Sequence, residues 1–160
     1  KLRWFNQQYL QGLSDESLAQ QCMAFSPELQ SQTADRVGAA ISLAKERLVV
    51  PQDLYNEHRY FFEAPSEYDQ KAASKQWKDD SPNLLAEFLK QCEKTSYTEE
   101  ELEVCLKAYS EASEIGVGKV MAPLRLALVG SLKGPSVYAL MHFLGKEEVA
   151  NRVANAANTL

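Results

Sequence analysis

The stretch from Gly116 to Gly145 constrains the fold most strongly, because it predicts two helices joined by a tight, glycine-bounded loop. Gly130 follows the last apolar position of the first helix, and a glycine there suits the left-handed conformation that ends many helices. Gly134-Pro135 is expected to open the second helix with Pro135 at its first position, where the missing N–H costs nothing. One buried face follows at helical spacing, made of Val137, Leu140, Met141 and Leu144.

The loop between these two helices, Ser131–Lys133, allows two interpretations. In the first, it is the ordinary short connector of a helical hairpin. In the second, its exposed N–H groups and the Lys133 amine face a helix N-terminus, where backbone donors and the helix dipole favour phosphates or nucleotide edges. The pattern alone leaves both interpretations open.

The first third of the chain also predicts helices, and no segment alternates apolar and polar residues for long. Ser14 is expected to cap a helix whose apolar face consists of Leu18, Cys22 and Phe25. Ser26-Pro27 is expected to start the next helix, with inward residues Val37, Ile41, Leu43, Ala44 and Leu48. Val49-Val50-Pro51 should end that helix, because the residue before a proline avoids helical geometry.

Further helices are expected from Ser81-Pro82, from the capping box that begins at Thr98, and over residues 146–160. A polar stretch that carries Pro65, residues 63–80, separates the two groups of helices. The sequence therefore predicts an all-α fold made of two packed helical subdomains, residues 1–62 and 63–160.

Composition restricts the setting of the protein more than its function. The 160 residues are 45% hydrophobic and 24% charged, as in globular proteins. No run of 18 apolar residues and no signal-peptide pattern occurs, so we expect a soluble, cytoplasmic protein with no membrane partner. The chain begins with Lys1 and not methionine, which suggests an excised or processed piece. The three cysteines lack paired spacing and are expected to be reduced thiols on apolar helix faces: Cys22, Cys92 and Cys105.

The net charge of −5 argues mildly against a nucleic-acid partner, but the charge is unevenly distributed. Residues 1–60 carry 6 basic and 7 acidic side chains, residues 61–114 carry 6 and 13, and residues 115–160 carry 5 and 2. A basic region on an acidic protein is a weak indication of a polyanionic partner.

No arrangement of residues indicates a catalytic site. His58 and His142 are the only histidines, and both lie in apolar helical stretches that favour a structural role. Metalloprotease, nucleophile-elbow and phosphate-loop motifs are missing. Gly116-Val117-Gly118-Lys119 lacks the preceding strand and the full spacing of a phosphate loop. We therefore expect no catalytic residue and no metal site, and we reject a stand-alone enzyme.

Four basic residues are better candidates for binding, because they lie at predicted helix ends or loop edges: Arg47, Lys119, Arg125 and Lys133. Arg125 lies within an apolar run, where a guanidinium without a partner is costly. Pairing with a carboxylate such as Glu114 is the simpler interpretation. The alternative is that its planar donors bind a phosphate or a base edge.

Four stretches of the sequence, taken together, resemble one known family. They are Lys1-Leu2-x-Trp4-Phe5-Asn6-x-x-Tyr9-Leu10, then Gly118-Lys119-Val120-Met121-x-Pro123-Leu124-Arg125-x-Ala127-Leu128-x-Gly130, and then Gly134-Pro135 and Leu144-Gly145-Lys146-Glu147. The chain closely resembles the C-terminal anticodon-binding region of bacterial-type glutamyl-tRNA synthetases, which are class I aminoacyl-tRNA synthetases. The resemblance spans nearly all 160 residues in the right order.

The resemblance implies a function in tRNA recognition. The whole enzyme of this family attaches glutamate to its tRNA with ATP and magnesium, and its catalytic domain would lie upstream, so this part would need no cofactor. Arg47 resembles the reader of the third anticodon base, which separates glutamate from glutamine tRNAs. The loop Lys133–Val137 resembles the segment that receives the other anticodon bases, and its candidate contacts are Lys133, Gly134, Pro135 and Val137. Pro135 and Val137 could offer apolar faces to these bases. Lys119 and Arg125 resemble supporting basic residues, and a monomer is implied.

Two positions depart from the family pattern, because many relatives have Thr or Ser where this chain has Val129 and Gly134. At the second, a backbone N–H could replace a hydroxyl contact. Some relatives have Gln at the position of Arg47. Strict discrimination of glutamate tRNA from glutamine tRNA through Arg47 is therefore a prediction. The alternative function is an all-helical protein-interaction module that uses the acidic 61–114 region. A tRNA module should gather the four basic residues on one surface, whereas an interaction module need not.

Overall fold

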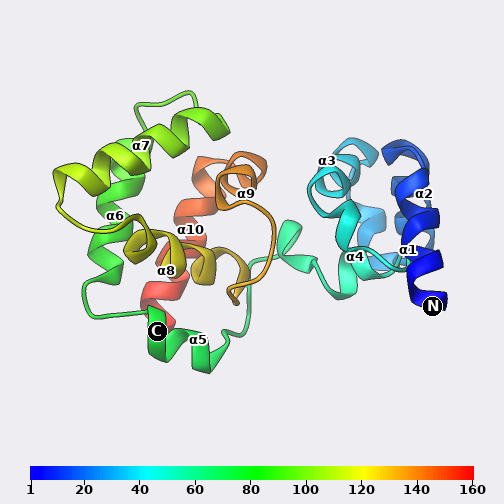
Figure 1. Cartoon of the computed structure of the whole chain (residues 1–160), viewed down its shortest axis with the longest axis horizontal. Coiled ribbons are helices and arrows are strands. Elements are labelled where there is room, and N and C mark those ends of the chain that lie inside the picture. The colour runs from blue at the N-terminus through cyan, green and yellow to red at the C-terminus, as the bar shows by residue number, and fades with distance from the viewer. The chain divides into compact units, whose positions relative to one another are not determined.

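The computed structural model describes all of residues 1–160, which form helices joined by turns and loops without any strand. The predicted all-α class is confirmed. The chain divides into two compact units, Lys1–Phe62 and Glu63–Leu160 (Figure 1). No helix has both the length and the apolar character that a membrane crossing requires.

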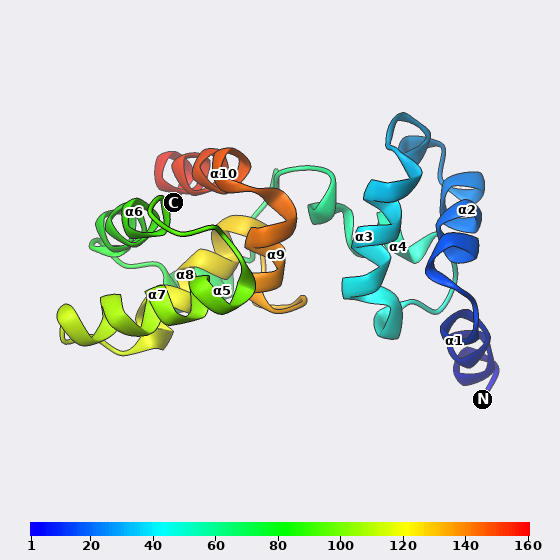
Figure 2. The same cartoon turned by 90° about the horizontal axis from the view of Figure 1, so that it is seen from above.

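Unit 1 (Lys1–Phe62) is built around the pair α2 and α3, which lie side by side in Figure 2. In chain order its elements are α1 (Leu2–Gly12), α2 (Asp15–Phe25), the 3₁₀ turn η1 (Pro27–Ser31), α3 (Ala34–Ala44), η2 (Lys45–Arg47), α4 (Asp53–Asn56) and η3 (Arg59–Phe61). The fully buried core side chains include Leu18, Cys22, Leu29, Val37, Ile41, Leu48, Leu54 and Phe61. Ser14 caps α2 as predicted, because its hydroxyl accepts the Ser17 N–H.

Two predictions for unit 1 are wrong in detail. Ser26-Pro27 opens the short turn η1 rather than a long helix, and α3 begins seven residues later, where the Thr33 hydroxyl accepts the Arg36 N–H. The Ser26 side chain makes no capping hydrogen bond, whereas the Thr33 hydroxyl does, and such a bond stabilises the N-terminus of a helix. Phe25 is 58% exposed at the end of α2, whereas Leu29 of the following turn is fully buried.

Unit 2 (Glu63–Leu160) is built around α8, which contacts every other helix of the unit (Figure 1). Its helices are α5 (Gln70–Gln76), α6 (Ser81–Cys92), α7 (Glu99–Ala112), α8 (Val117–Val129), α9 (Val137–Leu144) and α10 (Lys146–Thr159). The central position of α8 agrees with the apolar character of its sequence. Its buried side chains are Val120, Pro123, Leu124, Leu126, Ala127 and Leu128.

Helix α5 lies inside the polar stretch that the sequence marks only as a boundary. The Asp69 carboxylate caps it by accepting the Ala72 N–H at 3.0 Å. Its buried residues are two alanines, Ala72 and Ala73, and such a small apolar face is hidden among polar neighbours in the sequence.

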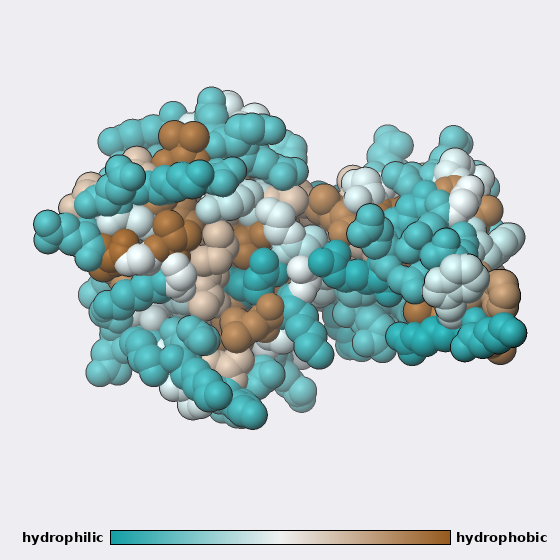
Figure 3. Space-filling view, viewed as in Figure 1, coloured by the Kyte–Doolittle hydropathy of each residue, from teal (hydrophilic) through white to brown (hydrophobic).

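Hydrophilic side chains cover most of the face in Figure 3, and hydrophobic ones appear among them in patches. In unit 1, α1 exposes four large apolar side chains, Leu2, Trp4, Phe5 and Tyr9. In unit 2, exposed apolar side chains include Val104 on α7 and Leu132 in the loop before α9.

Candidate nucleic-acid interface

The α8–α9 loop (Ser131–Ser136) begins at a glycine that no other residue could replace without strain. Gly130 ends α8 in the left-handed region, with φ +87°, as the sequence predicts. Its carbonyl accepts the Asp69 N–H at 2.8 Å. A Cβ at this position would lie 2.6 Å from the Glu67 carbonyl oxygen and 3.0 Å from the Pro65 Cβ. The glycine therefore allows both the left-handed turn and the close packing of α8 on the segment before α5.

The far end of the loop differs from the prediction. Pro135 does not occupy the first position of α9, because the helix begins at Val137 with Ser136 as its N-cap. The Ser136 hydroxyl accepts the Ala139 N–H at 3.4 Å, a bond that Gly134 has no side chain to make. The predicted buried face of α9 is confirmed, with Val137, Leu140, Met141 and Leu144 all buried.

Arg125 holds this loop from α8. Its guanidinium donates to the Pro135 carbonyl at 2.7 Å. This contact with the backbone of the loop was not predicted. The two interpretations of Arg125 were an ion pair with a carboxylate such as Glu114 and a bond to a phosphate or a base edge. The bond fixes the carbonyl that precedes the cap of α9, so Arg125 shapes the loop.

Arg152 of α10 supports the same region from within the core, and the sequence did not indicate it. The side chain is 2% exposed, and its guanidinium donates to the Leu128 carbonyl at 2.8 Å and to Glu148 at 3.0 Å. The last carbonyls of a helix lack partners within it, and Arg152 supplies one for α8 two residues before Gly130. The Glu148–Arg152 spacing was visible in the sequence, but it is typical of exposed helix pairs and gave no sign of burial.

The loop residues differ in their exposure. Lys133 and Leu132 are exposed, and the Lys133 N–H donates to the Ser131 hydroxyl at 3.3 Å. Pro135 and Val137 are buried, so neither offers the apolar face to a ligand that the resemblance suggested. Half-buried Gly134 has φ +129°, a conformation that glycine adopts easily.

Lys119 lies at the other end of α8. Its amine binds the Asp80 carboxylate at 2.8 Å, and this hydrogen bond and charge hold the pKa of Asp80 below its usual value. Ten residues of helix separate Lys119 from Val129, a rise of about 15 Å. Within unit 2 the structure therefore brings Arg125 to the loop of Lys133, Gly134 and Pro135, but does not bring Lys119 there.

Arg47 belongs to unit 1, where it ends the turn η2. The residue is exposed, and its guanidinium donates to the Leu43 carbonyl at 3.4 Å. Arg47 also acts on His58, whose pKa is lowered first by burial and second by the positive charge of Arg47. Nearby, the Asp53 carboxylate accepts the N–H groups of Val49 and Val50 at 2.9 and 3.1 Å, which fixes the turn that follows η2.

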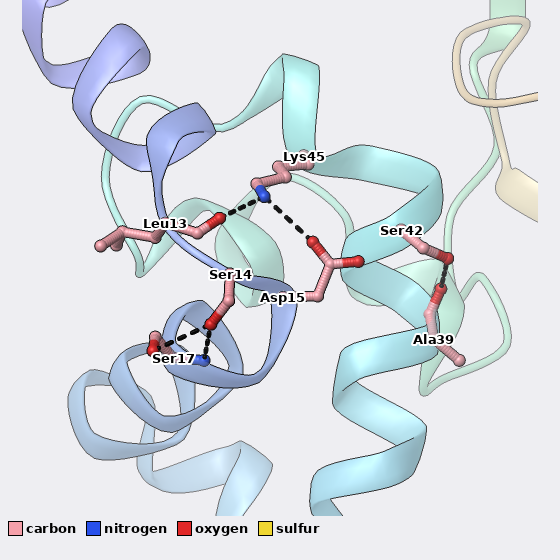
Figure 4. Close-up of polar contacts among 7 residues, drawn as sticks. All are labelled: Leu13, Ser14, Asp15, Ser17, Ala39, Ser42 and Lys45. Carbon is pink, nitrogen blue, oxygen red and sulfur yellow. Dashed lines mark hydrogen bonds and ion pairs between the residues drawn. The ribbon is translucent and has the colours of Figure 1, made fainter.

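Lys45 anchors the other end of η2, and Figure 4 shows its amine reaching two partners. It donates to the Leu13 carbonyl and to the Asp15 carboxylate, the latter at 3.0 Å. The Gln7 amide also donates to the Glu46 carbonyl of η2. The backbone beneath Arg47 is thus tied to α1 and α2, while the Arg47 side chain stays at the surface.

The histidines have structural contacts. His58 Nδ1 lies 3.0 Å from the Tyr60 hydroxyl, and His142 Nδ1 lies 2.8 Å from the Tyr97 carbonyl. No group of three or more His, Cys, Asp or Glu residues is placed to hold a metal ion.

The residues that shape the α8–α9 loop fall within a region that matches a known family. The family described as the anticodon binding domain matches residues 17–157. This chain belongs to the anticodon-binding domain family. The match covers both the turn of Arg47 and the α8–α9 loop, so both candidate contact regions are part of the family domain.

The relatives carry one activity in their names. Glutamate–tRNA ligases from Christiangramia forsetii and Flavobacterium johnsoniae are 36% and 39% identical, and each match covers 100% of this chain and 32% of the relative. A crystallised glutamate–tRNA ligase from Elizabethkingia meningosepticum, in complex with its amino acid, matches with a TM-score of 0.87 and 36% identity, over 99% of this chain and 32% of that one. The chain therefore spans about a third of the length of these ligases, the C-terminal third.

Proposed function

We propose that this anticodon-binding domain is part of a glutamate–tRNA ligase and binds the anticodon loop of the glutamate tRNA. The observation that carries the proposal is the α8–α9 loop, which Arg125, Gly130 and Arg152 hold in one shape while Lys133 stays exposed. Single-stranded RNA loops splay their bases outward, and proteins read them with backbone groups and arginine planes. A preformed loop with an exposed amine suits that task.

Arg47 is proposed to read the third anticodon base. Its exposed guanidinium is a planar set of donors on a turn fixed by Lys45, Gln7 and Asp53. Such donors can form two parallel hydrogen bonds to one base edge. This assignment rests on the resemblance of the sequence, and it predicts an enzyme that prefers glutamate tRNA to glutamine tRNA.

The remaining basic residues receive graded roles. Lys133 is proposed to contact phosphate, because it is exposed in the loop itself. Lys119 is proposed as a weaker contact, since binding RNA would compete with its ion pair to Asp80. Arg125 is proposed to act through the shape of the loop, because its guanidinium already binds the Pro135 carbonyl.

The chemistry of the whole ligase, in which ATP and magnesium take part, is proposed to belong to parts of the enzyme outside this chain. The enzyme is proposed to act as a monomer in the cytoplasm. The support is the length of the relatives, since this chain spans only 32% of each of the two glutamate–tRNA ligases named above.

A binding titration tests the proposal. The glutamate tRNA, made as a labelled transcript, would be titrated with the chain. In parallel, the same tRNA with all three anticodon bases replaced would be titrated. The charge of the two RNAs is equal, so phosphate contacts alone would bind both equally and with the same salt dependence. We expect tighter binding of the native anticodon at every salt concentration.

Equal binding of the two tRNAs would contradict anticodon reading and would leave a generic polyanion surface. Absence of binding by the folded chain would also contradict the proposal. It would favour the alternative, a protein-interaction module that uses the acidic 61–114 region, where α7 begins with Glu99, Glu100 and Glu101.

A further inference from the structure

Two cysteine side chains of unit 2 lie against each other across a helix pair. Cys92 is the last residue of α6, and Cys105 lies in the second turn of α7. Their Sγ atoms are 3.9 Å apart. All three cysteines of the chain are free thiols, and the third, Cys22, is buried in the core of unit 1. The sequence predicted reduced thiols but did not pair Cys92 with Cys105.

The two thiols differ in access to solvent. Cys92 is 1% exposed, and Cys105 is half-buried. Burial is the main cause that raises the pKa of Cys92 well above its ordinary value. Cys105 is therefore the thiol that a small reagent can reach, and Cys92 is a protonated thiol held beside it.

The surroundings of Cys92 fix its position. The Thr95 hydroxyl donates to the Cys92 carbonyl at 2.7 Å. The Lys146 amine of α10 donates to the carbonyls of Glu93 and Thr95, at 3.3 and 3.2 Å. The segment between the two helices is thus held by its own side chains and by α10, which keeps the end of α6 beside α7.

We propose that Cys92 and Cys105 form an oxidation site, at which a hydroperoxide converts the two thiols into a disulfide that links α6 to α7. The sulfurs are already in contact, and a disulfide needs a separation of about 2 Å, so the remaining movement of about 2 Å is small enough for side-chain rotation. The proposal stands apart from RNA binding, because neither cysteine belongs to the α8–α9 loop or to the turn of Arg47.

The reaction takes two steps. The Cys105 thiolate attacks one oxygen of the peroxide, the O–O bond breaks, and the leaving hydroxide takes up a proton to become water. Cys105 is then a sulfenic acid. Cys92 Sγ attacks Cys105 Sγ, the S–O bond breaks, and the leaving hydroxide takes the Cys92 proton. Two thiols and one hydrogen peroxide thus give one disulfide and two waters.

The test uses the full chain treated with hydrogen peroxide at neutral pH, followed by denaturation, alkylation of the remaining thiols and mass spectrometry. We expect the peptides that carry Cys92 and Cys105 to be joined with a loss of two hydrogens. Cys22 should remain a thiol during the peroxide treatment and should therefore be found alkylated. The disulfide should raise the melting temperature of unit 2 by about 10–20 °C, because it restricts the conformations of the unfolded chain.

Two variants and one condition serve as controls. Cys22→Ala should oxidise like the natural chain, and Cys92→Ala should give only oxygen addition at Cys105. In denaturant Cys22 becomes accessible as well, so it should also be oxidised and the selectivity for the pair should weaken. Some preference for the pair remains, because its loop of 13 residues closes more readily than one to Cys22. Oxygen addition at Cys105 of the natural chain without loss of two hydrogens, cross-linked dimers, or unreacted thiols would each overturn the proposal.

Discussion

The α8–α9 loop of unit 2 and the turn η2 of unit 1 are the two regions proposed to contact RNA, and they are built in different ways. The loop is shaped from within by a buried guanidinium and a left-handed glycine, Arg152 and Gly130. The turn is held by polar contacts that are only partly buried, among them the pair of Lys45 and Asp15. The difference indicates that the shape of the loop depends on residues buried inside unit 2, whereas Arg47, the residue proposed to read RNA, lies exposed on unit 1.

The largest effect is expected from Arg152→Met in unit 2. The variant removes the hydrogen bonds of a buried guanidinium to Glu148 and to the Leu128 carbonyl, at a cost of about 3 kcal/mol in the free energy of unfolding. Arg47→Gln, at the exposed guanidinium of unit 1, should change stability by less than about 0.5 kcal/mol.

Tryptophan fluorescence during urea unfolding measures both, because Trp4 lies in unit 1 and Trp77 in unit 2. In a Trp4→Phe background the signal comes from unit 2, and in a Trp77→Phe background from unit 1. Equal costs for Arg152→Met and Arg47→Gln would erase the contrast between the two regions.

Gly130→Ala should have the next largest effect. A side chain at φ +87° is strained, and its Cβ would lie 2.6 Å from the Glu67 carbonyl oxygen, so we expect a loss of about 2–3 kcal/mol. Gly38→Ala is the matched control in unit 1. It lies inside α3 with nothing within 4 Å of an added Cβ, and it should gain about 0.5–1 kcal/mol. Thermal unfolding of both variants decides, and a neutral Gly130→Ala would contradict the tight packing at the end of α8.

Lys45→Met should cost unit 1 about 1–2 kcal/mol, because it removes the bonds to the Leu13 carbonyl and to Asp15. Lys107→Met in unit 2 is the matched control. Its amine forms an exposed helix pair with Glu103 at 3.2 Å, which is worth at most about 0.5 kcal/mol. If urea unfolding gives the same small loss for both, η2 is not anchored through Lys45.

The smallest expected effect is electrostatic and links Arg47 to His58. Because the folded pKa of His58 lies below its ordinary value of 6.5, the unfolded chain binds this proton more readily, and unit 1 loses stability as pH falls from about 6.5 to the folded pKa. Arg47→Gln should raise the pKa of His58 in an NMR titration. Glu57→Gln should lower it further, because the Glu57 charge raises it. Shifts of the same sign in the two variants would contradict the placement of Arg47 near His58.

The sequence predicted those parts of the fold that follow from local rules. The all-α class, the buried face of α9 and the Gly130 cap each depend on helical spacing or on the conformation of one residue. The prediction of Pro135 as the first residue of α9 was wrong, because Ser136 offers a hydroxyl cap and Gly134 offers none. Helix α5 was missed because it buries only alanines.

The candidate site was predicted less well, since its construction depends on contacts between distant segments. The bond of Arg125 to the Pro135 carbonyl and the burial of Arg152 under Leu128 join residues that no local pattern relates. Lys119 was grouped with the loop residues by charge, but α8 keeps it a helix length away and Asp80 binds it. The assignment of Arg47 to the third anticodon base rests on the family resemblance and stays a prediction.

The central claim is that Arg47 of unit 1 and the α8–α9 loop of unit 2 both bind the anticodon. A ratio of two binding affinities tests it most directly. The ratio compares the glutamate tRNA with the same tRNA changed only at the third anticodon base, for the natural chain, Arg47→Gln and Lys133→Gln. We predict that Arg47→Gln abolishes the preference for the native base, which is worth about 1–3 kcal/mol for a bidentate contact. Lys133→Gln should weaken the binding of both tRNAs equally. A preference that survives Arg47→Gln but disappears in Lys133→Gln would contradict it.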